Sequence, residues 1–94
     1  MGLQKNLEQA VSWIRKSAEQ GYGRAQNKMG VFYRDGIGVS ANPVEAYAWF
    51  SVAVTNGFTD SSKSRDDLEK TLTPEQLQQA KDLANKYSEQ FKMK

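Results

Sequence analysis

Apolar residues recur at steps of three and four along most of the chain, which is the period of amphipathic α-helices. The first stripe predicts a helix over residues 7–20. Its apolar members are Leu7, Ala10, Val11, Trp13, Ile14 and Ala18. Asn6 is the expected N-cap of this helix, and Gly21 is its expected left-handed stop.

Two further stripes predict helices over 24–34 and 43–55, separated by the glycine-containing run 35–38. The inward positions of the earlier of the two are Ala25, Met29, Phe32 and Tyr33. Asn42 is the expected N-cap of the later helix, and Pro43 occupies its first position, where a missing amide hydrogen costs nothing. This helix is apolar on more than one side, which is typical of a helix with neighbours on several sides.

The last third of the chain predicts two helices of different character. A short polar helix is expected over 60–70, with Leu68 as its only large aliphatic residue. Thr73 and Gln76 form a capping-box pattern around Pro74, so the final helix is expected to begin there. Its apolar stripe is Leu77, Ala80, Ala84, Tyr87 and Phe91. A terminal helix with a polar outer face is suited to closing a stack of helices.

The chain repeats itself at a shift of 36 residues. The coinciding pairs are Asn6 and Asn42, Ala10 and Ala46, Trp13 and Trp49, and Gly21 and Gly57. Such a period is the length of one helix-turn-helix unit, which stacks on its neighbours because it cannot bury its apolar face alone. The sequence therefore predicts an all-α stack of antiparallel helix pairs.

The amino-acid composition excludes several kinds of functional site. The chain has no cysteine and no histidine, which excludes disulfides, thiolate or imidazole metal sites and a histidine general base. Its 13 basic and 11 acidic residues leave a net charge of +2, which argues against a nucleic-acid partner. No apolar run approaches the roughly 18 residues of a membrane span, so no membrane insertion is expected. We expect a soluble protein with no catalytic residues, no cofactor and no metal.

Residues 25–39, AQNKMGVFYRDGIGV, carry a recognisable pattern that continues through Trp49 to Gly57. It closely resembles the Sel-one-like repeat, a relative of the tetratricopeptide repeat with a longer loop between its helices. Met29 replaces the usual leucine of that repeat, and Arg65 and Asp66 replace the leucine-glycine pair in the last unit. The structural positions of the pattern are Trp13, Ala25, Met29, Gly30, Tyr33, Gly36, Gly38, Ala46, Trp49, Ala53 and Gly57.

The resemblance implies a right-handed α-superhelix of about five antiparallel helices that ends in a capping helix. The single domain, 1–94, would comprise a half repeat at 6–21, a complete repeat at 22–57, a degenerate repeat helix at 58–72 and the capping helix at 73–94. The resemblance further implies a bacterial adaptor, of which this chain would be the C-terminal part of a longer repeat protein. Its compartment would be the cytoplasm, or the periplasm if an upstream leader exists.

A charged face of the second helix is the candidate site for a partner. The groove expected from related stacks would be lined by Arg24, Asn27, Lys28, Val31 and Arg34, with Lys63 and Asp67 at matching positions of the fourth helix. Arginine and lysine there favour an acidic or carboxylate-terminated peptide. The alternative is a merely solvated face, because charged helix surfaces are usually exposed.

The sequence is compatible with other functions as well. The tryptophan and tyrosine content allows a small-molecule or glycan binder of the bacterial envelope, with a hydrolase activity credited to a cysteine-rich branch of the family whose cysteines are missing here. The acidic cluster of Asp66, Asp67 and Glu69 is interpreted as a solvated face because basic residues surround it. The first helix is also expected to expose part of its apolar stripe and to promote self-association at high concentration.

Overall fold

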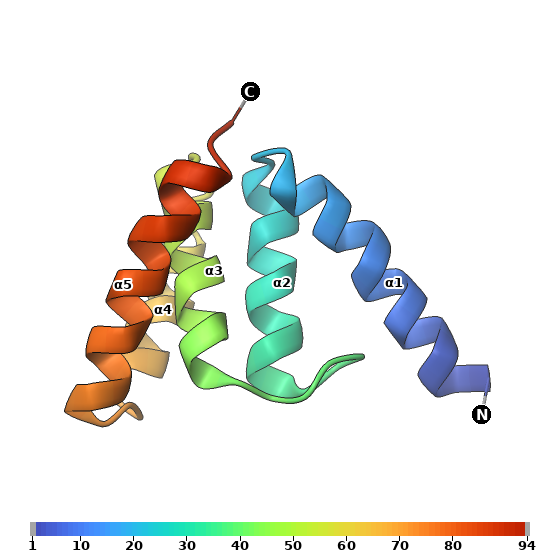
Figure 1. The fold of residues 1–94 in the computed structure, drawn as a ribbon, viewed down its shortest axis with the longest axis horizontal. Helices are drawn as coiled ribbons and strands as arrows, with labels where there is room; N and C mark the ends of the chain where they lie inside the picture. The colour runs from blue at the N-terminus through green and yellow to red at the C-terminus, as the bar shows by residue number, and fades with distance from the viewer. Residues whose placement is uncertain (1, 94) are drawn as a thin grey trace.

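The computed structural model describes residues 2–93, which form five helices and their connections (Figure 1). The helices are α1 (Gly2–Glu19), α2 (Gly23–Asp35), α3 (Pro43–Thr55), α4 (Ser61–Glu69) and α5 (Pro74–Gln90). No strand occurs in this range, so the predicted all-α architecture is confirmed. None of the five helices is both long enough and apolar enough to cross a bilayer within residues 2–93.

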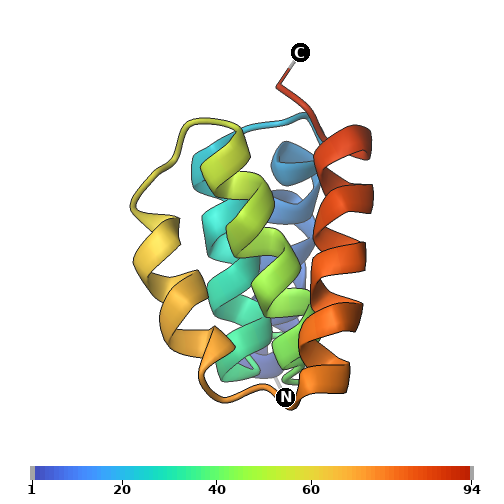
Figure 2. The same ribbon diagram turned by 90° about the vertical axis from the view of Figure 1, so that its left-hand side faces the viewer.

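Helix α3 lies at the centre of the stack. It packs against α2 on one side and α5 on another, and α4 covers a third side (Figures 1 and 2). Helix α1 lies at the opposite edge and packs mainly on α2. This arrangement explains why the sequence of α3 is apolar on several sides. Its buried residues are Ala46, Tyr47, Ala48, Trp49, Phe50, Val52 and Ala53.

The predicted N-terminal caps of α3 and α5 are confirmed in atomic detail. The Asn42 Oδ1 atom accepts hydrogen bonds from the amides of Val44 at 3.1 Å and Glu45 at 3.2 Å. At α5, the Gln76 amide donates to Thr73 Oγ1 at 3.1 Å, and the Thr73 amide donates to Gln76 Oε1 at 3.0 Å. Both helices therefore begin with their first amide groups satisfied.

The predicted start of the first helix is wrong. Helix α1 begins at Gly2, so Asn6 lies inside the helix and is not an N-cap. The repeat explains the difference, because Leu7 stands where the later unit has Pro43. A proline ring keeps the preceding residue out of the α region, and Asn42 has a φ of −151°. Leu7 exerts no such restriction, so the chain before it continues as helix.

Glycine allows α2 and α3 to approach closely. A Cβ atom on Gly30 would lie 2.5 Å from the Phe50 ring, so any side chain there would force this ring to move. Phe50 is fully buried at this crossing. The backbone also turns at Gly21, with a φ of 99°, which confirms the predicted left-handed stop of α1.

Helix α5 covers Trp49 with two aromatic rings. The Phe91 ring stacks on Trp49 with a centroid separation of 5.3 Å, and the Tyr87 ring lies 4.7 Å away. The Tyr87 hydroxyl donates a hydrogen bond to Glu45 Oε1 at 2.8 Å. Burial, and then this bond to Glu45, raise the pKa of Tyr87 well above its ordinary value. The capping helix is thus bound to α3 by both apolar and polar contacts.

A polar bridge joins the end of α5 to three other parts of the stack. The buried Gln26 Nε2 donates to the carbonyl oxygens of Ala18 at 2.9 Å and Phe91 at 3.0 Å. Asn56 Nδ2 donates to Gln26 Oε1 at 3.0 Å and to the Phe91 carbonyl at 2.9 Å. We call Gln26, Asn56 and the Phe91 carbonyl the polar bridge. It satisfies a side chain that would otherwise be buried at high cost.

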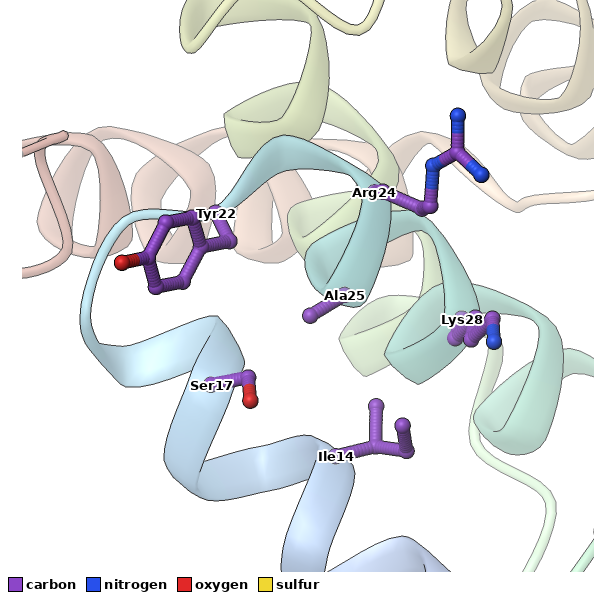
Figure 3. Close-up of a pocket in the computed structure, with 6 residues that line it drawn as sticks. All are labelled: Ile14, Ser17, Tyr22, Arg24, Ala25 and Lys28. Carbon is purple, nitrogen blue, oxygen red and sulfur yellow. The ribbon is translucent and has the colours of Figure 1, made fainter.

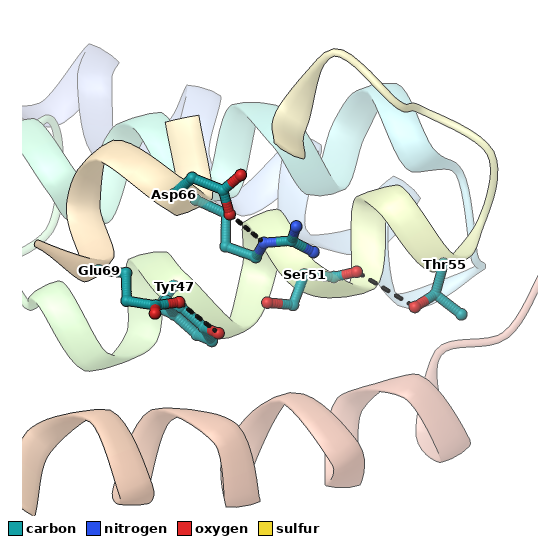
Figure 4. A network of polar contacts seen from close by, with 6 residues as sticks. Tyr47, Ser51, Thr55, Asp66 and Glu69 are labelled. Carbon is teal, nitrogen blue, oxygen red and sulfur yellow. Dashed lines mark hydrogen bonds and ion pairs between the residues drawn. The ribbon is translucent and has the colours of Figure 1, made fainter. Parts of the chain in front are cut away.

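Helix α4 is held to α3 by few apolar contacts. Leu68 and Ser61 are its buried residues. The Tyr47 hydroxyl of α3 donates to Glu69 at 3.3 Å, and Arg65 pairs with Asp66 at 3.1 Å (Figure 4). Burial and the neighbouring Glu69 raise the pKa of Tyr47. The short polar helix expected in this region is confirmed.

Candidate partner-binding surface

The predicted groove divides into two parts with different roles. On α2, Arg24, Lys28 and Arg34 are exposed. Asn27 and Val31 are half-buried, and Val31 packs against the core cluster around Tyr47 and Phe50. The predicted charged side of α2 therefore exists, but only part of it faces solvent.

The part of the groove nearest α4 is occupied by contacts within the chain. Asn27 Oδ1 accepts a hydrogen bond from Ser61 at 2.6 Å, which joins α2 to α4. Lys63 pairs with Asp67 at 3.0 Å on the surface of α4. Arg34 pairs with Asp35 at 2.9 Å, and this contact raises the pKa of Arg34 and lowers the pKa of Asp35. These polar groups already have partners.

A pocket of about 330 Å³ opens on the other side, between α1 and α2 (Figure 3). It is lined by Ile14, Ser17, Tyr22, Arg24, Ala25 and Lys28. Its wall is mostly apolar, and Arg24 and Lys28 line it from α2. The Arg24 guanidinium points away from the apolar lining residues (Figure 3). Among the ion pairs found within residues 2–93, none involves Arg24 or Lys28. We call this site the α1–α2 pocket.

An exposed aromatic surface continues from the α1–α2 pocket. A second hollow of about 420 Å³ shares Ser17 and Tyr22 with it and adds Trp13 and the end of α1. Trp13 is 69% exposed and Tyr22 is 56% exposed. Large aromatic side chains of this kind are common where proteins bind one another.

The expected packing of Trp13 is therefore wrong. Its repeat counterpart, Trp49, is 1% exposed because Tyr87 and Phe91 cover it. The Lys16 ammonium lies over the exposed Trp13 ring, 5.0 Å from the ring centroid. Ala10, expected in the inward stripe, is exposed as well. The face of α1 that carries Ala10 and Trp13 has no covering helix within the described range.

The acidic cluster of α4 does not converge on one point. Asp66 pairs with Arg65, and Glu69 accepts a hydrogen bond from Tyr47 (Figure 4). Asp67 pairs with Lys63. No group of three or more acidic, histidine or cysteine side chains within residues 2–93 is arranged to hold a metal ion. Tyr33 packs against the core, and its hydroxyl accepts a hydrogen bond from Arg15 at 2.8 Å.

The repeat pattern and the helix stack match those of known proteins. The sequence profile of the Sel1 repeat matches residues 1–22 and 23–58. This chain belongs to the Sel1 repeat family. Sel1 repeat proteins generally mediate protein–protein interaction.

The Sel1 repeat chain is similar to segments of much longer proteins. It is 37% identical over 65 residues to chitin synthase regulatory factor 3 of Schizosaccharomyces pombe. It is 33% identical over 66 residues to a chitin synthase regulator of Malassezia restricta. These alignments cover 69% and 70% of the chain, but 7% and 5% of the relatives. The bacterial origin expected from the resemblance stays a prediction, since these relatives are fungal.

A solved structure shares the fold. The crystal structure of a protective antigen with an SLR fold, present in uropathogenic Escherichia coli strains, matches with a TM-score of 0.88 and 43% identity. The match covers 90% of this chain and 18% of the antigen chain. The Sel1-like helical repeat predicted from the sequence is thereby confirmed.

The repeat positions of this Sel1 chain lie mainly in the core. Ala25, Met29, Ala46, Trp49 and Ala53 are all buried. Gly36, Gly38 and Gly57 have φ values of 70°, 69° and 97° and form the turns. The residues that sequence reasoning missed are Ile14, Ser17 and Tyr22 as parts of a pocket. The sequence contained one signal for Tyr22: at the repeat shift of 36 residues it aligns with Phe58, so this position of the repeat carries an aromatic residue in both units.

Proposed function

We propose that this Sel1 repeat chain is an adaptor module that binds an acidic segment of a partner protein at the α1–α2 pocket. The main supporting observation is that Arg24 and Lys28 border an apolar pocket, while the other groove cation on α2, Arg34, is paired with Asp35. The family's general role in protein interaction supports the same proposal. We further propose that the chain acts without catalysis, without a cofactor and without a nucleic-acid partner.

The two kinds of lining would contribute differently to binding. Ile14, Ala25 and the ring of Tyr22 offer apolar area whose removal from water favours association. Arg24 presents a planar fork of donors that matches a carboxylate, and Lys28 presents a mobile positive charge. Because both cations are exposed, they would mainly set the rate of association and its dependence on salt.

Reversing both charges is expected to weaken binding by about tenfold, because each exposed pair contributes up to about 1 kcal/mol. The test uses 12-residue peptides selected from a phage-displayed library on the unmodified chain. Their affinity is then measured by fluorescence anisotropy for Arg24→Glu with Lys28→Glu. A matched control, Lys81→Glu with Lys86→Glu, changes the net charge equally on the exposed side of α5. Equal affinity for all three proteins would contradict a basic site at this pocket.

A small molecule is the second candidate occupant of the same pocket. Its volume of about 330 Å³ lies at the lower end of the range for ligand sites. A glycan or metabolite would stabilise the folded chain in a thermal-shift screen, by an amount that grows with the logarithm of its concentration once the pocket is nearly saturated. Such a ligand would have to compete with the selected peptides to occupy the α1–α2 pocket.

We also propose that copies of the chain associate weakly through the exposed aromatic surface of α1. Trp13 faces solvent, whereas Val11 is 3% exposed. Trp13→Ser is therefore expected to disperse the association without unfolding the chain, while Val11→Glu is expected to unfold it. Sedimentation equilibrium at millimolar concentration measures the first effect. A chain that is already strictly monomeric at that concentration would refute self-association.

A further inference from the structure

The turn after α3 contains the one asparagine of the chain that precedes a glycine, Asn56 before Gly57. The residues that follow the other asparagines are larger: Leu7, Lys28, Pro43 and Lys86. A backbone nitrogen can attack the side-chain amide of a preceding asparagine, and glycine leaves that nitrogen unobstructed because it has no Cβ atom. A Cβ atom built on Gly57 would meet no atom of the described residues beyond its chain neighbours within 4 Å. The dipeptide therefore has the chemistry of a deamidation site.

The polar bridge holds the side chain of Asn56 by both ends. Asn56 Nδ2 donates to Gln26 Oε1 at 3.0 Å and to the Phe91 carbonyl at 2.9 Å. Asn56 Oδ1 accepts a hydrogen bond from the Met93 amide at 3.2 Å. The end of α5 lies here beside the end of α3 and the start of α2 (Figure 1). Two of the three partners thus belong to the segment that ends α5, so the side chain is held only while that segment is docked.

The backbone of Asn56 keeps the reacting atoms apart. At its ψ of 18°, the Gly57 nitrogen lies on the far side of the Cα–C bond from Cβ, as the handedness of an L-residue requires. Attack on the side chain needs both atoms on the same side of that bond. The Gly57 amide also donates to the Val54 carbonyl oxygen at 3.0 Å, and the required rotation would break this hydrogen bond. The folded turn therefore opposes the reaction.

We propose that Asn56 is a site of spontaneous deamidation which the docked end of α5 keeps closed, and that the reaction weakens the docking of α5. When the segment at 91–93 detaches, the side chain and ψ of Asn56 are free to rotate. The Gly57 nitrogen attacks Asn56 Cγ, the Cγ–Nδ2 bond breaks, and ammonia leaves with the Gly57 amide proton. Water then opens the cyclic succinimide to aspartate or isoaspartate. The α1–α2 pocket plays no part in this reaction.

The product cannot re-form the polar bridge. An aspartate places a carboxylate oxygen where Nδ2 was, facing two further acceptors, Gln26 Oε1 and the Phe91 carbonyl. Half-buried acceptors without a donor between them are costly. Isoaspartate also lengthens the backbone after α3 by one methylene. The corresponding turn of the first repeat carries Gln20 before Gly21, and a glutamine would have to close a larger ring.

Incubation of the whole chain in ¹⁸O-labelled water tests the site. Opening of the succinimide places ¹⁸O in residue 56, and digestion in ordinary water prevents later labelling. Electron-transfer fragmentation distinguishes aspartate from isoaspartate. The folded chain should react at least about tenfold more slowly than the chain unfolded in urea, because reaction then requires a local opening. Tyr87→Ala with Phe91→Ala should accelerate the reaction of the folded chain at least about tenfold, because fewer contacts oppose that opening. Asn85, exposed on α5, is the internal control and should stay unlabelled.

Asn56→Asp tests the consequence for α5 directly. It should speed hydrogen exchange at the Phe91 amide, which donates to the Tyr87 carbonyl at 2.8 Å, by at least about tenfold. Asn85→Asp makes the same change of charge at an exposed position and should leave that exchange unaltered. Equal labelling of the folded and urea-unfolded chains would overturn the protection by α5, and an unlabelled Asn56 in urea would overturn the site itself. Unchanged exchange at Phe91 in Asn56→Asp would refute the effect on docking.

Discussion

Replacing Trp49 by alanine is expected to lower the free energy of unfolding by about 3 to 5 kcal/mol. Trp49 of α3 is 1% exposed and lies in a core cluster with residues of α1 and α2, covered by the rings of Tyr87 and Phe91. Its removal would leave a cavity at the point where the capping helix meets the centre of the stack. Since small domains have a total stability of roughly 5 to 15 kcal/mol, much of the population would unfold. Urea unfolding followed by circular dichroism measures the change.

The repeat supplies a matched control for this substitution. Trp13→Ala removes the same side chain from the corresponding position of the repeat, where it is 69% exposed. We expect a change within about 0.5 kcal/mol, as for other surface substitutions. Similar losses of stability for Trp13→Ala and Trp49→Ala would contradict the difference in burial between the two side chains. A Trp49 variant with an unchanged midpoint would contradict its role in the core.

Truncation after Thr71 is expected to abolish cooperative folding. The cut removes α5 and with it the rings that cover Trp49, so a large apolar surface of α3 would be exposed. It also removes the Phe91 carbonyl, which leaves the buried amide of Gln26 without one of its acceptors. The fragment should bind a hydrophobic dye, retain part of its helical signal and lose a sharp thermal transition.

A full-length variant separates the loss of packing from the loss of chain. Tyr87→Ala with Phe91→Ala keeps α5 and the Phe91 backbone carbonyl but removes the two rings that cover Trp49. We expect a destabilised but still cooperative protein, because the polar bridge and the contacts of Ala80 and Ala84 remain. A truncated fragment that unfolds as sharply as the whole chain would show that α5 is not needed to close the stack.

The sequence predicted the elements whose signals are local. The Asn42 cap, Pro43 and the capping box of Thr73 lie within a few residues of the amides that they satisfy, so their effect does not depend on the rest of the fold. Repeat periodicity then predicted how the helices stack. The start of α1 was missed because the repeat alignment carried Asn42 over to Asn6 without the proline that makes Asn42 a cap.

Features that depend on distant parts of the chain could not be predicted in this way. Trp13 and Trp49 occupy the same repeat position, and their different exposure is decided by whether another helix covers them. Gln26 appears as an ordinary polar residue in the sequence, yet it is buried because Phe91, 65 positions later, accepts its hydrogen bond. The same limit applies to the predicted partner-binding groove. Arg34 and Lys63 matched the helical spacing of a groove, but nearby carboxylates already pair with them.

The position of α1 at the edge of the stack has a consequence for its dynamics. This helix is packed mainly on α2, whereas α3 is enclosed by three helices. Amide hydrogens of α1 are therefore expected to exchange through a local opening of lower free energy than the global unfolding that exposes α3. Because the α1–α2 pocket exists only while α1 is closed, the open population would reduce the observed affinity for a partner in proportion. A bound partner segment would in turn hold α1 closed and slow exchange along it, so that binding strength and the rigidity of this one helix become linked quantities.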